Sequence, residues 1–256
     1  IQMSGGNADP GAIIDIENNN WTTSTGAFNF RTYYGGIPTG TRKVIGNSTD
    51  KLVRLWYAQG YTVTDNHFFA GVEFFDDVNA QLPSTWARNF SDQPLNNGIA
   101  MSGATCCTGT LNSTYFYVPS SRPVDTHFFQ SGSATGTTVT ITGSVFEAAN
   151  TATANHEGSV ITDGLNTLAL TNSIITTDGS STFTSGRPTA LLGGATTRAT
   201  VNHNTYFSNS STKTGAEIGE GGVDFAGMMV SVKYNVVWGT NGAGGGGLVA
   251  QTIASV

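Results

Sequence analysis

A short alternation of apolar and polar residues recurs along the chain and predicts strands. In the segment 139–146, Val-Thr-Ile-Thr-Gly-Ser-Val-Phe, the first and third positions are apolar and the residue between them is polar. This period of two places one face of a strand in a core. Long helices are not expected, because Gly, Thr, Ser, Asn and β-branched residues interrupt every candidate stretch. The same frame fits six segments: 14–21, 61–68, 139–146, 168–175, 199–206 and 230–237.

The six segments can be aligned on an anchor, which is the second apolar residue of each copy. The last three intervals between successive anchors are 29, 31 and 31 residues, whereas the first two are 47 and 78 residues. A nearly constant interval of this size is typical of stacked repeats, each of which buries its apolar face against the next. The anchors are Ile16, Val63, Ile141, Leu170, Val201 and Val232.

Three residues after each anchor stands a small side chain that can hydrogen-bond the backbone, which predicts a turn at the end of the strand. These turn residues are Asn19, Asn66, Ser144, Ser173, Asn204 and Asn235. Because neighbouring strands lie about 4.7–4.9 Å apart, we expect the turn side chains also to bond one another as a ladder along the stack. Two residues further, a second interior column is expected: Trp21, Phe68, Phe146, Ile175, Tyr206 and Val237.

A second strand in each repeat is predicted at 159–163, 189–193 and 215–219. The whole pattern resembles the right-handed parallel β-helix of the pectin-lyase-like superfamily, including its asparagine-ladder turns. The resemblance implies an all-β fold, a solenoid of coils of about 30 residues with apolar columns inside. A β-sandwich binding module is disfavoured, because it does not predict this register or the column of Asn and Ser.

The chain is expected to be one continuous domain with four parts. Residues 1–69 and 136–240 are predicted to form β-helix coils, of which the second set is the more regular. Between 70 and 135 the pattern fades, and a loop-rich aromatic insertion or degenerate coils are both expected alternatives. Residues 241–256 are predicted to be a Gly-rich hinge and a capping strand, because an open solenoid end would otherwise pair with other chains.

The composition excludes several kinds of partner. Only 11% of the 256 residues are charged, the formal net charge is −6, and the 11 basic residues are scattered, so nucleic acid is not an expected partner. No apolar run is long enough for membrane insertion. Cys106 and Cys107 are adjacent, which leaves two alternatives, a strained vicinal disulfide or two buried thiols.

The proteins that share this architecture imply two classes of function. The first is a surface structural protein: a phage tail spike or fibre, a capsid decoration protein or an adhesin, located outside the cell or on the virion surface. Such a protein would contact a surface polysaccharide or a host receptor, and would form a homotrimer or assemble with other virion proteins. The second class is a polysaccharide-degrading enzyme, either a glycoside hydrolase or a lyase, with carboxylates on the coil face. We find no recognisable catalytic set, and the fold alone does not choose between the two.

For the enzyme, the candidate catalytic pair is Asp163 and Glu220. Each stands two places after an apolar residue of the second strand, Ile161 or Ile218. If these two residues share a column two coils apart, the carboxylates lie about 10 Å from each other, near the separation of about 6.5–9.5 Å that inverting glycosidases use. The alternative is that both are turn residues.

Aromatic residues supply the candidate glycan-binding site. Tyr33, Tyr34 and Trp56 are the rings expected to be exposed, beside polar groups that could bond sugar hydroxyls. The alternative is that the aromatic residues pack loops onto the coil or fill a subunit interface. The four histidines lack metal-ligand spacing, so neither a metal nor another cofactor is expected.

Overall fold

The computed structural model describes the chain as an all-β protein with parallel sheets. The residues described are 2–5, 11–22, 28–32, 39–58, 60–76, 84–92, 97–101, 107–112, 115–118, 127–131, 137–149, 158–164, 167–178, 187–193, 198–208, 217–218, 229–239 and 249–250. Within these ranges the regular elements are strands, and none is a helix. This part of the chain therefore agrees with the all-β class expected from the alternating pattern.

The strands form three parallel sheets, here named A, B and C. Sheet A contains β1 (Gln2–Gly5), β4 (Phe28–Thr32), β7 (Val53–Ala58), β10 (Val72–Asp76), β13 (Asn97–Met101), β16 (His127–Ser131), β19 (Gly158–Gly164), β22 (Arg187–Gly193), β25 (Glu217–Ile218) and β28 (Val249–Ala250). Sheet B contains β2 (Ile14–Glu17), β5 (Arg42–Ile45), β8 (Thr62–Thr64), β11 (Thr85–Ala87), β14 (Cys107–Asn112), β17 (Thr137–Thr142), β20 (Thr167–Thr171), β23 (Arg198–Asn202) and β26 (Met229–Lys233). Sheet C contains β3 (Asn20–Trp21), β6 (Ser48–Thr49), β9 (His67–Phe68), β12 (Phe90–Asp92), β15 (Tyr115–Val118), β18 (Val145–Ala149), β21 (Ile174–Asp178), β24 (Thr205–Ser208) and β27 (Val236–Gly239).

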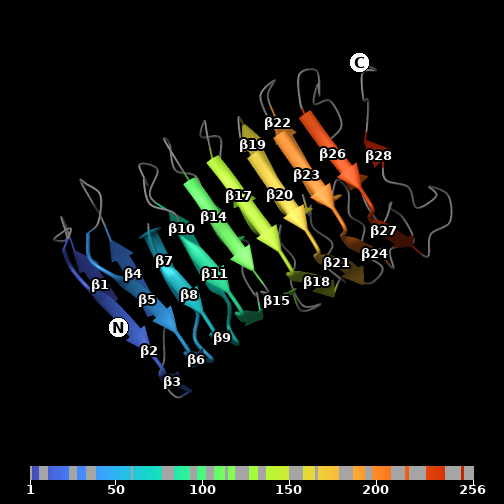
Figure 1. Ribbon diagram of the computed structural model, residues 1–256. Helices are drawn as coiled ribbons and strands as arrows, with labels where there is room; N and C mark the ends of the chain where they lie inside the picture. Colours follow the sequence, from blue (N-terminus) through green and yellow to red (C-terminus); the bar gives the residue numbers. More distant parts are fainter. Residues whose placement is uncertain are drawn as a thin grey trace.

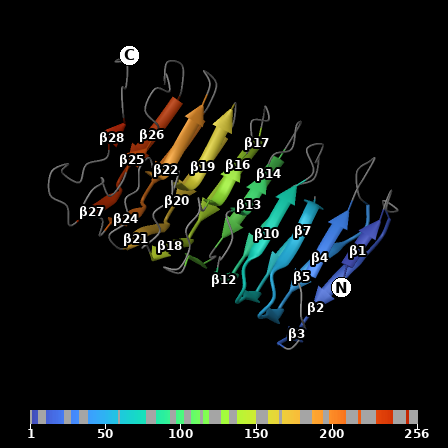
Figure 2. The same ribbon diagram turned by 180° about the vertical axis from the view of Figure 1, so that it is seen from behind.

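Successive strands belong to sheets A, B and C in turn, so each sheet gains one strand per repeat. Each strand from β1 to β25 pairs in parallel with the strand three places later in the chain, as β2 does with β5 and β3 with β6. Figure 1 shows the strands of sheet B side by side in chain order, and Figure 2 shows those of sheet A from behind. Parallel strands need a connection that returns to the starting edge. Here the strands of the other two sheets make that connection.

The anchors of sheet B form one column. Strand pairing places Ile16 beside Val44, Val44 beside Val63, and the column continues through Trp86, Leu111, Ile141, Leu170 and Val201 to Val232. Val63, Trp86, Ile141, Leu170 and Val201 are 0% exposed. The 47-residue interval thus contains one additional repeat, with Val44, and the 78-residue interval contains two, with Trp86 and Leu111.

The other two sheets contribute their own inward columns. In sheet C, Phe68, Ser91, Phe146 and Ile175 are fully buried. In sheet A, Leu55 and Phe74 are buried, and the Phe74 ring meets the Trp86 ring of sheet B edge-on, with centroids 5.1 Å apart. Each large apolar side chain buried in this way stabilises the fold by about 1.5–3 kcal/mol relative to leaving it exposed.

Strands also occupy the segment 70–135. Strands β10 to β16 lie there, contribute to all three sheets, and pair without interruption with β7, β8 and β9 before them and β17, β18 and β19 after them. Of the segment 241–256, only β28 is described, and it pairs with β25 as the last strand of sheet A.

Candidate functional site

The turn from sheet B to sheet C is the best-defined polar region of the described chain. It contains two residues, as at Asn18 and Asn19 between β2 and β3. The first of them has a positive φ in each described repeat: Asn18 (55°), Gly46 (66°), Asp65 (60°), Arg88 (53°), Gly143 (58°), Asn172 (50°), His203 (58°) and Tyr234 (58°). This left-handed conformation bends the chain sharply between the strand of sheet B and the strand of sheet C. The first turn residue therefore points outward in repeat after repeat.

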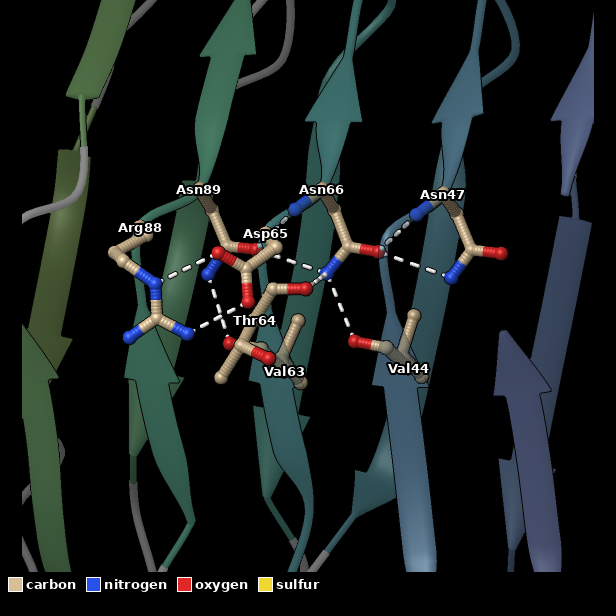
Figure 3. Close-up of polar contacts among 8 residues, drawn as sticks. All are labelled: Val44, Asn47, Val63, Thr64, Asp65, Asn66, Arg88 and Asn89. Carbon is tan, nitrogen blue, oxygen red and sulfur yellow. Dashed lines mark hydrogen bonds and ion pairs between the residues drawn. The ribbon is translucent and has the colours of Figure 1, made fainter. Parts of the chain in front are cut away.

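The second turn residue forms a ladder in the N-terminal repeats (Figure 3). Oδ1 of Asn66 accepts hydrogen bonds from the backbone N–H and from Nδ2 of Asn47, both at 2.9 Å. Nδ2 of Asn66 in turn donates to Oδ1 of Asn89 at 2.9 Å and to the carbonyl of Val44 at 2.8 Å. Asn19 bonds Asn47 in the same way, at 3.0 Å. The amides of Asn47 and Asn66 therefore each connect three successive repeats.

The ladder continues in the C-terminal repeats with different side chains. The backbone N–H of Ser144 donates to Oγ of Ser173 at 3.2 Å, and that of Ser173 donates to Oδ1 of Asn204 at 2.9 Å. Asn204 donates its own N–H to Oδ1 of Asn235 at 2.8 Å. All six residues that the sequence singles out for the ladder thus stand at this turn. Asn47 and Asn89 complete the described part of it, and the sequence analysis missed both.

Charged side chains pair at the exposed first turn residue. Arg88 donates through Nε and Nη2 to the two carboxylate oxygens of Asp65, at 2.7 and 2.6 Å, in the neighbouring repeat. The hydrogen bond from Arg88 is the main reason that the pKa of Asp65 lies below its ordinary value. Both side chains are exposed, so solvent screens the pair and its effect on stability is small.

Rings also stack between or within repeats at this edge. His67 lies parallel to Phe69, with centroids 3.6 Å apart, and meets the edge of Phe90 at 4.3 Å. His203 stacks on Tyr234 of the next repeat at 4.9 Å. Phe69 is 48% exposed and Tyr234 is 75% exposed, so both offer an accessible ring.

The candidate glycan-binding residues are only partly described. Trp56 lies in β7, where strand pairing places it between Arg31 and Phe75. Tyr33 and Tyr34 lie outside the described residues. Their part in sugar binding stays a prediction.

The candidate catalytic pair rests on a register that the strands of sheet A do not have. Asp163 lies in β19 beside Leu192 of β22, and Glu220 lies outside the described residues. Ile218 pairs with Thr189, and Thr189 pairs with Val160, so Ile218 is one residue out of register with Ile161. Since strand residues alternate between faces, equal spacing from these two residues does not place Asp163 and Glu220 in one column. The catalytic role of Asp163 and Glu220 stays a prediction, and the shared column from which it was inferred does not support it.

Two further kinds of site were sought in the described residues. No three His, Cys, Asp or Glu side chains there lie together so that they could hold a metal ion. No helix of this part of the chain is long and apolar enough to cross a membrane. Of the two cysteines, Cys107 begins β14 beside Thr137, and Cys106 lies outside the described residues.

Comparison with known proteins returns no match among protein-family models, curated proteins or solved structures.

Proposed function

We propose that the chain is a right-handed parallel β-helix that serves as a structural protein of a virion or cell surface. It would act as a spike, fibre, capsid decoration protein or adhesin, contact surface glycans, and assemble with other copies of itself, most simply as a homotrimer. The parallel sheets, in which each strand pairs with the strand three places later, support the β-helix. The Asn and Ser ladder supports it further, because such ladders satisfy the polar groups of turns stacked in register.

The outer face of sheet C is the observation that carries the assembly. Strand pairing aligns Phe90, Val145, Ile174 and Val236 on the outward positions of this sheet, in register with one another through β15 and β24. Ile174 is 42% exposed and Val236 is 60% exposed. Aligned apolar side chains that face solvent indicate a surface that another molecule covers. Because every copy carries the same column, three copies can pack these columns against one another around a threefold axis.

The exposed rings support the contact with glycans. His67 and Phe69 stack at the N-terminal end of the same face, next to the polar outward residues Asn20 and Ser48 of β3 and β6. A flat ring can lie against the face of a sugar while neighbouring amide and hydroxyl groups bond its hydroxyls. The apolar end of the outer face of sheet C would then contact other copies of the chain, and its polar end would bind glycans.

Native mass in solution tests this function. We expect a homo-oligomer, with a trimer near three times the 26.7 kDa of the chain. The double variant Ile174→Lys with Val236→Lys should shift the mass toward the monomer, because it places charge in the apolar column. Thr62→Lys, on the outer face of sheet B, is the matched control and should leave the mass unchanged. A monomeric unmodified protein would contradict the assembly and favour the alternative, a polysaccharide-degrading enzyme.

A further inference from the structure

The described stack of repeats is open at both ends of sheets B and C. β2 and β3 are the first strands of these sheets and β26 and β27 the last, and Figure 1 shows them at opposite ends of the stack. The anchors there, Ile16 and Val232, are partly exposed, whereas Val63 and Val201 are 0% exposed. The end of a sheet presents unpaired backbone groups to which another strand can bond.

The turn from sheet B to sheet C shows how one repeat bonds the next. The N–H of the first turn residue donates to a carbonyl of the following repeat, as His203 does to Lys233 at 3.0 Å. The N–H of the second turn residue donates to the ladder side chain of the following repeat, as Asn204 does to Asn235 at 2.8 Å. In the other direction, the N–H of the first residue in a strand of sheet C donates to the ladder residue of the repeat before, as Val236 does to the carbonyl of Asn204 at 2.8 Å.

At the two ends these same groups have no partner within the described chain, and they are complementary. At the last repeat they are the N–H groups of Tyr234 and Asn235, which donate, and the carbonyl of Asn235, which accepts. At the first repeat, the carbonyl of Glu17 accepts only from the side chain of Asn19, and Oδ1 of Asn19 accepts no hydrogen bond. The N–H of Asn20 points away from β6, because the carbonyls of the residues on either side of it accept from β6 and the turn after it. Each donor at one end therefore has its acceptor at the other.

Charge and apolar surface at the two ends match in the same register. If β2 follows β26 as β26 follows β23, then Ile16 lies beside Val232 and Glu17 lies beside Lys233. Both partly exposed anchors would then be covered. Glu17 and Lys233 are exposed and have opposite charges, which favours this register over a shifted one. Glu17 also lies 3.6 Å from Lys43 of its own chain, so its carboxylate would stand between two ammonium groups.

We propose that copies of this chain stack end to end, with β2 and β3 of one copy pairing in parallel with β26 and β27 of the next. A second copy is the occupant because this one chain carries both halves of the contact, at opposite ends. Each hydrogen bond exchanged with water contributes little alone, so the association depends on several bonds formed together with burial of the anchors. A head-to-tail contact of this kind does not close on itself when successive copies follow one axis, and it produces a filament.

The end-to-end contact is distinct from the contact through the outer face of sheet C. Packing around a threefold axis closes at three copies, so its mass reaches a limit. Stacking along the axis has no limit, so its mass keeps rising with protein concentration. Either contact can therefore fail without the other.

The mass of the purified chain, measured by light scattering over a wide range of concentration, tests the proposal. We expect a continuous rise with concentration and unbranched filaments by electron microscopy. Asn20→Pro should hold the mass at that of a closed oligomer or a monomer at every concentration, because proline has no N–H to donate and its ring occupies the edge of β3. Proline is tolerated at an edge position whose N–H faces away from the sheet. Asn20→Ala keeps the N–H, so this matched control should elongate like the parent.

Exchange of charges gives a second test that does not alter the backbone. Glu17→Lys alone or Lys233→Glu alone places like charges side by side between copies, and at low ionic strength each should lower the mass reached at a given concentration. The double variant with both substitutions restores opposite charges and should recover most of the elongation. A double variant that elongated no better than the single variants would contradict the register of the contact.

A mass of the unmodified chain that did not rise with concentration would overturn the proposal. So would elongation of Asn20→Pro equal to that of the parent, provided that its circular dichroism melt shows it to be folded. Elongation that is lost in the Ile174→Lys, Val236→Lys variant but kept in Asn20→Pro would also overturn it, because the outer face of sheet C would then be responsible. If Asn20→Pro does not fold, the charge exchange decides, since both of its positions are exposed.

Discussion

The asparagine positions and the serine positions of the turn ladder stabilise the same turn by different means. In the N-terminal repeats the amides of Asn47 and Asn66 each donate to the next amide of the ladder and to a backbone carbonyl one repeat earlier, as Asn66 does to Asn89 and Val44. At a serine position, the hydroxyl of Ser173 accepts from the N–H of Ser144 and donates only to the carbonyl of Thr171 in its own repeat. The next ladder residue, Asn204, again donates to a carbonyl of the repeat before it, that of Leu170. A hydroxyl has one proton to donate, whereas an amide has two. The side chain of an asparagine therefore both accepts from and donates to neighbouring repeats, whereas the hydroxyl of Ser173 accepts from the neighbouring repeat but donates within its own.

The comparison teaches that the second turn residue can link successive repeats to different extents, depending on its side chain. Where the second turn residue is Asn, successive repeats are held by side chain and backbone together. Where it is Ser, the side chain keeps only its accepting bond to the neighbouring repeat, and the strands of the sheets and the buried columns carry the rest of the contact. Each of the following experiments changes this contrast, beginning with the largest expected effect.

Replacing Ile141 or Val201 with Asp should unfold the protein whichever ladder type lies beside it. Both side chains are 0% exposed within the anchor column, and an isolated carboxylate there costs at least about 4–5 kcal/mol, a large share of the stability of a domain. Thermal melts followed by circular dichroism measure the loss of stability in each variant. Thr200→Asp, one residue from Val201 but on the outer face, is the control and should cost no more than about 0.5 kcal/mol. A melt of either core variant that matched the parent would contradict the register of the column.

Alanine at the ladder should cost more in the asparagine part than in the serine part. Asn66→Ala removes an amide that forms hydrogen bonds with four buried groups. Each buried group left without its partner costs about 1–3 kcal/mol, and relaxation of the neighbouring residues recovers part of this, so we expect the free energy of unfolding to fall by about 2–4 kcal/mol. Ser173→Ala leaves one buried N–H without its acceptor, and about 1 kcal/mol is expected. Chemical denaturation of both variants measures the difference. Equal losses would show that the cross-links between repeats contribute nothing beyond satisfying the turn.

Asp65→Asn should have the smallest effect, and the effect should depend on pH. The hydrogen bond from Arg88 lowers the pKa of Asp65 in the folded protein. The pair therefore stabilises the fold at pH values above the ordinary Asp pKa of about 3.9, and this stabilisation is lost as the pH falls through the lower pKa of the folded state. Because both groups are exposed, we expect a small loss of stability at neutral pH and a smaller one in high salt. The difference in melting temperature between the parent and the variant, measured at pH 7 and near pH 3, tests this. A melting-temperature difference that grew toward low pH would contradict this prediction, because the ion pair is expected to stabilise the fold only when Asp65 is ionised.

The anchor frame was predictable because it depends on neighbours in the chain. Alternation over three residues, followed by a small polar turn residue, identifies β2, β8, β17, β20, β23 and β26 together with the turns that follow them. The repeats with Val44 and Trp86 were missed for a physical reason. Their first positions are Arg42 and Ser84 and their last are Thr49 and Ser91, so polar residues occupy sites where the frame expects apolar ones.

Tertiary contacts make these polar residues acceptable inside. The guanidinium of Arg42 lies over the ring of Tyr61 at 5.9 Å from the centroid, and Oγ of Ser84 accepts the N–H of Tyr61 at 3.2 Å. The signal that could have found both repeats is the asparagine three residues after the anchor, Asn47 and Asn89, which keeps its place although the apolar positions change.

What the sequence by itself determined is local: the strands, the turn from sheet B to sheet C and the identity of the inward column all follow from alternation and turn chemistry within eight residues. What only the tertiary structure decided is the alignment between repeats. The pairing of Ile218 with Thr189 in sheet A depends on the lengths of the connections and on cross-strand contacts, and a shift of one residue exchanges the two faces of a strand. For the same reason the apolar column on the outer face of sheet C became visible only when strands far apart in the chain were placed side by side.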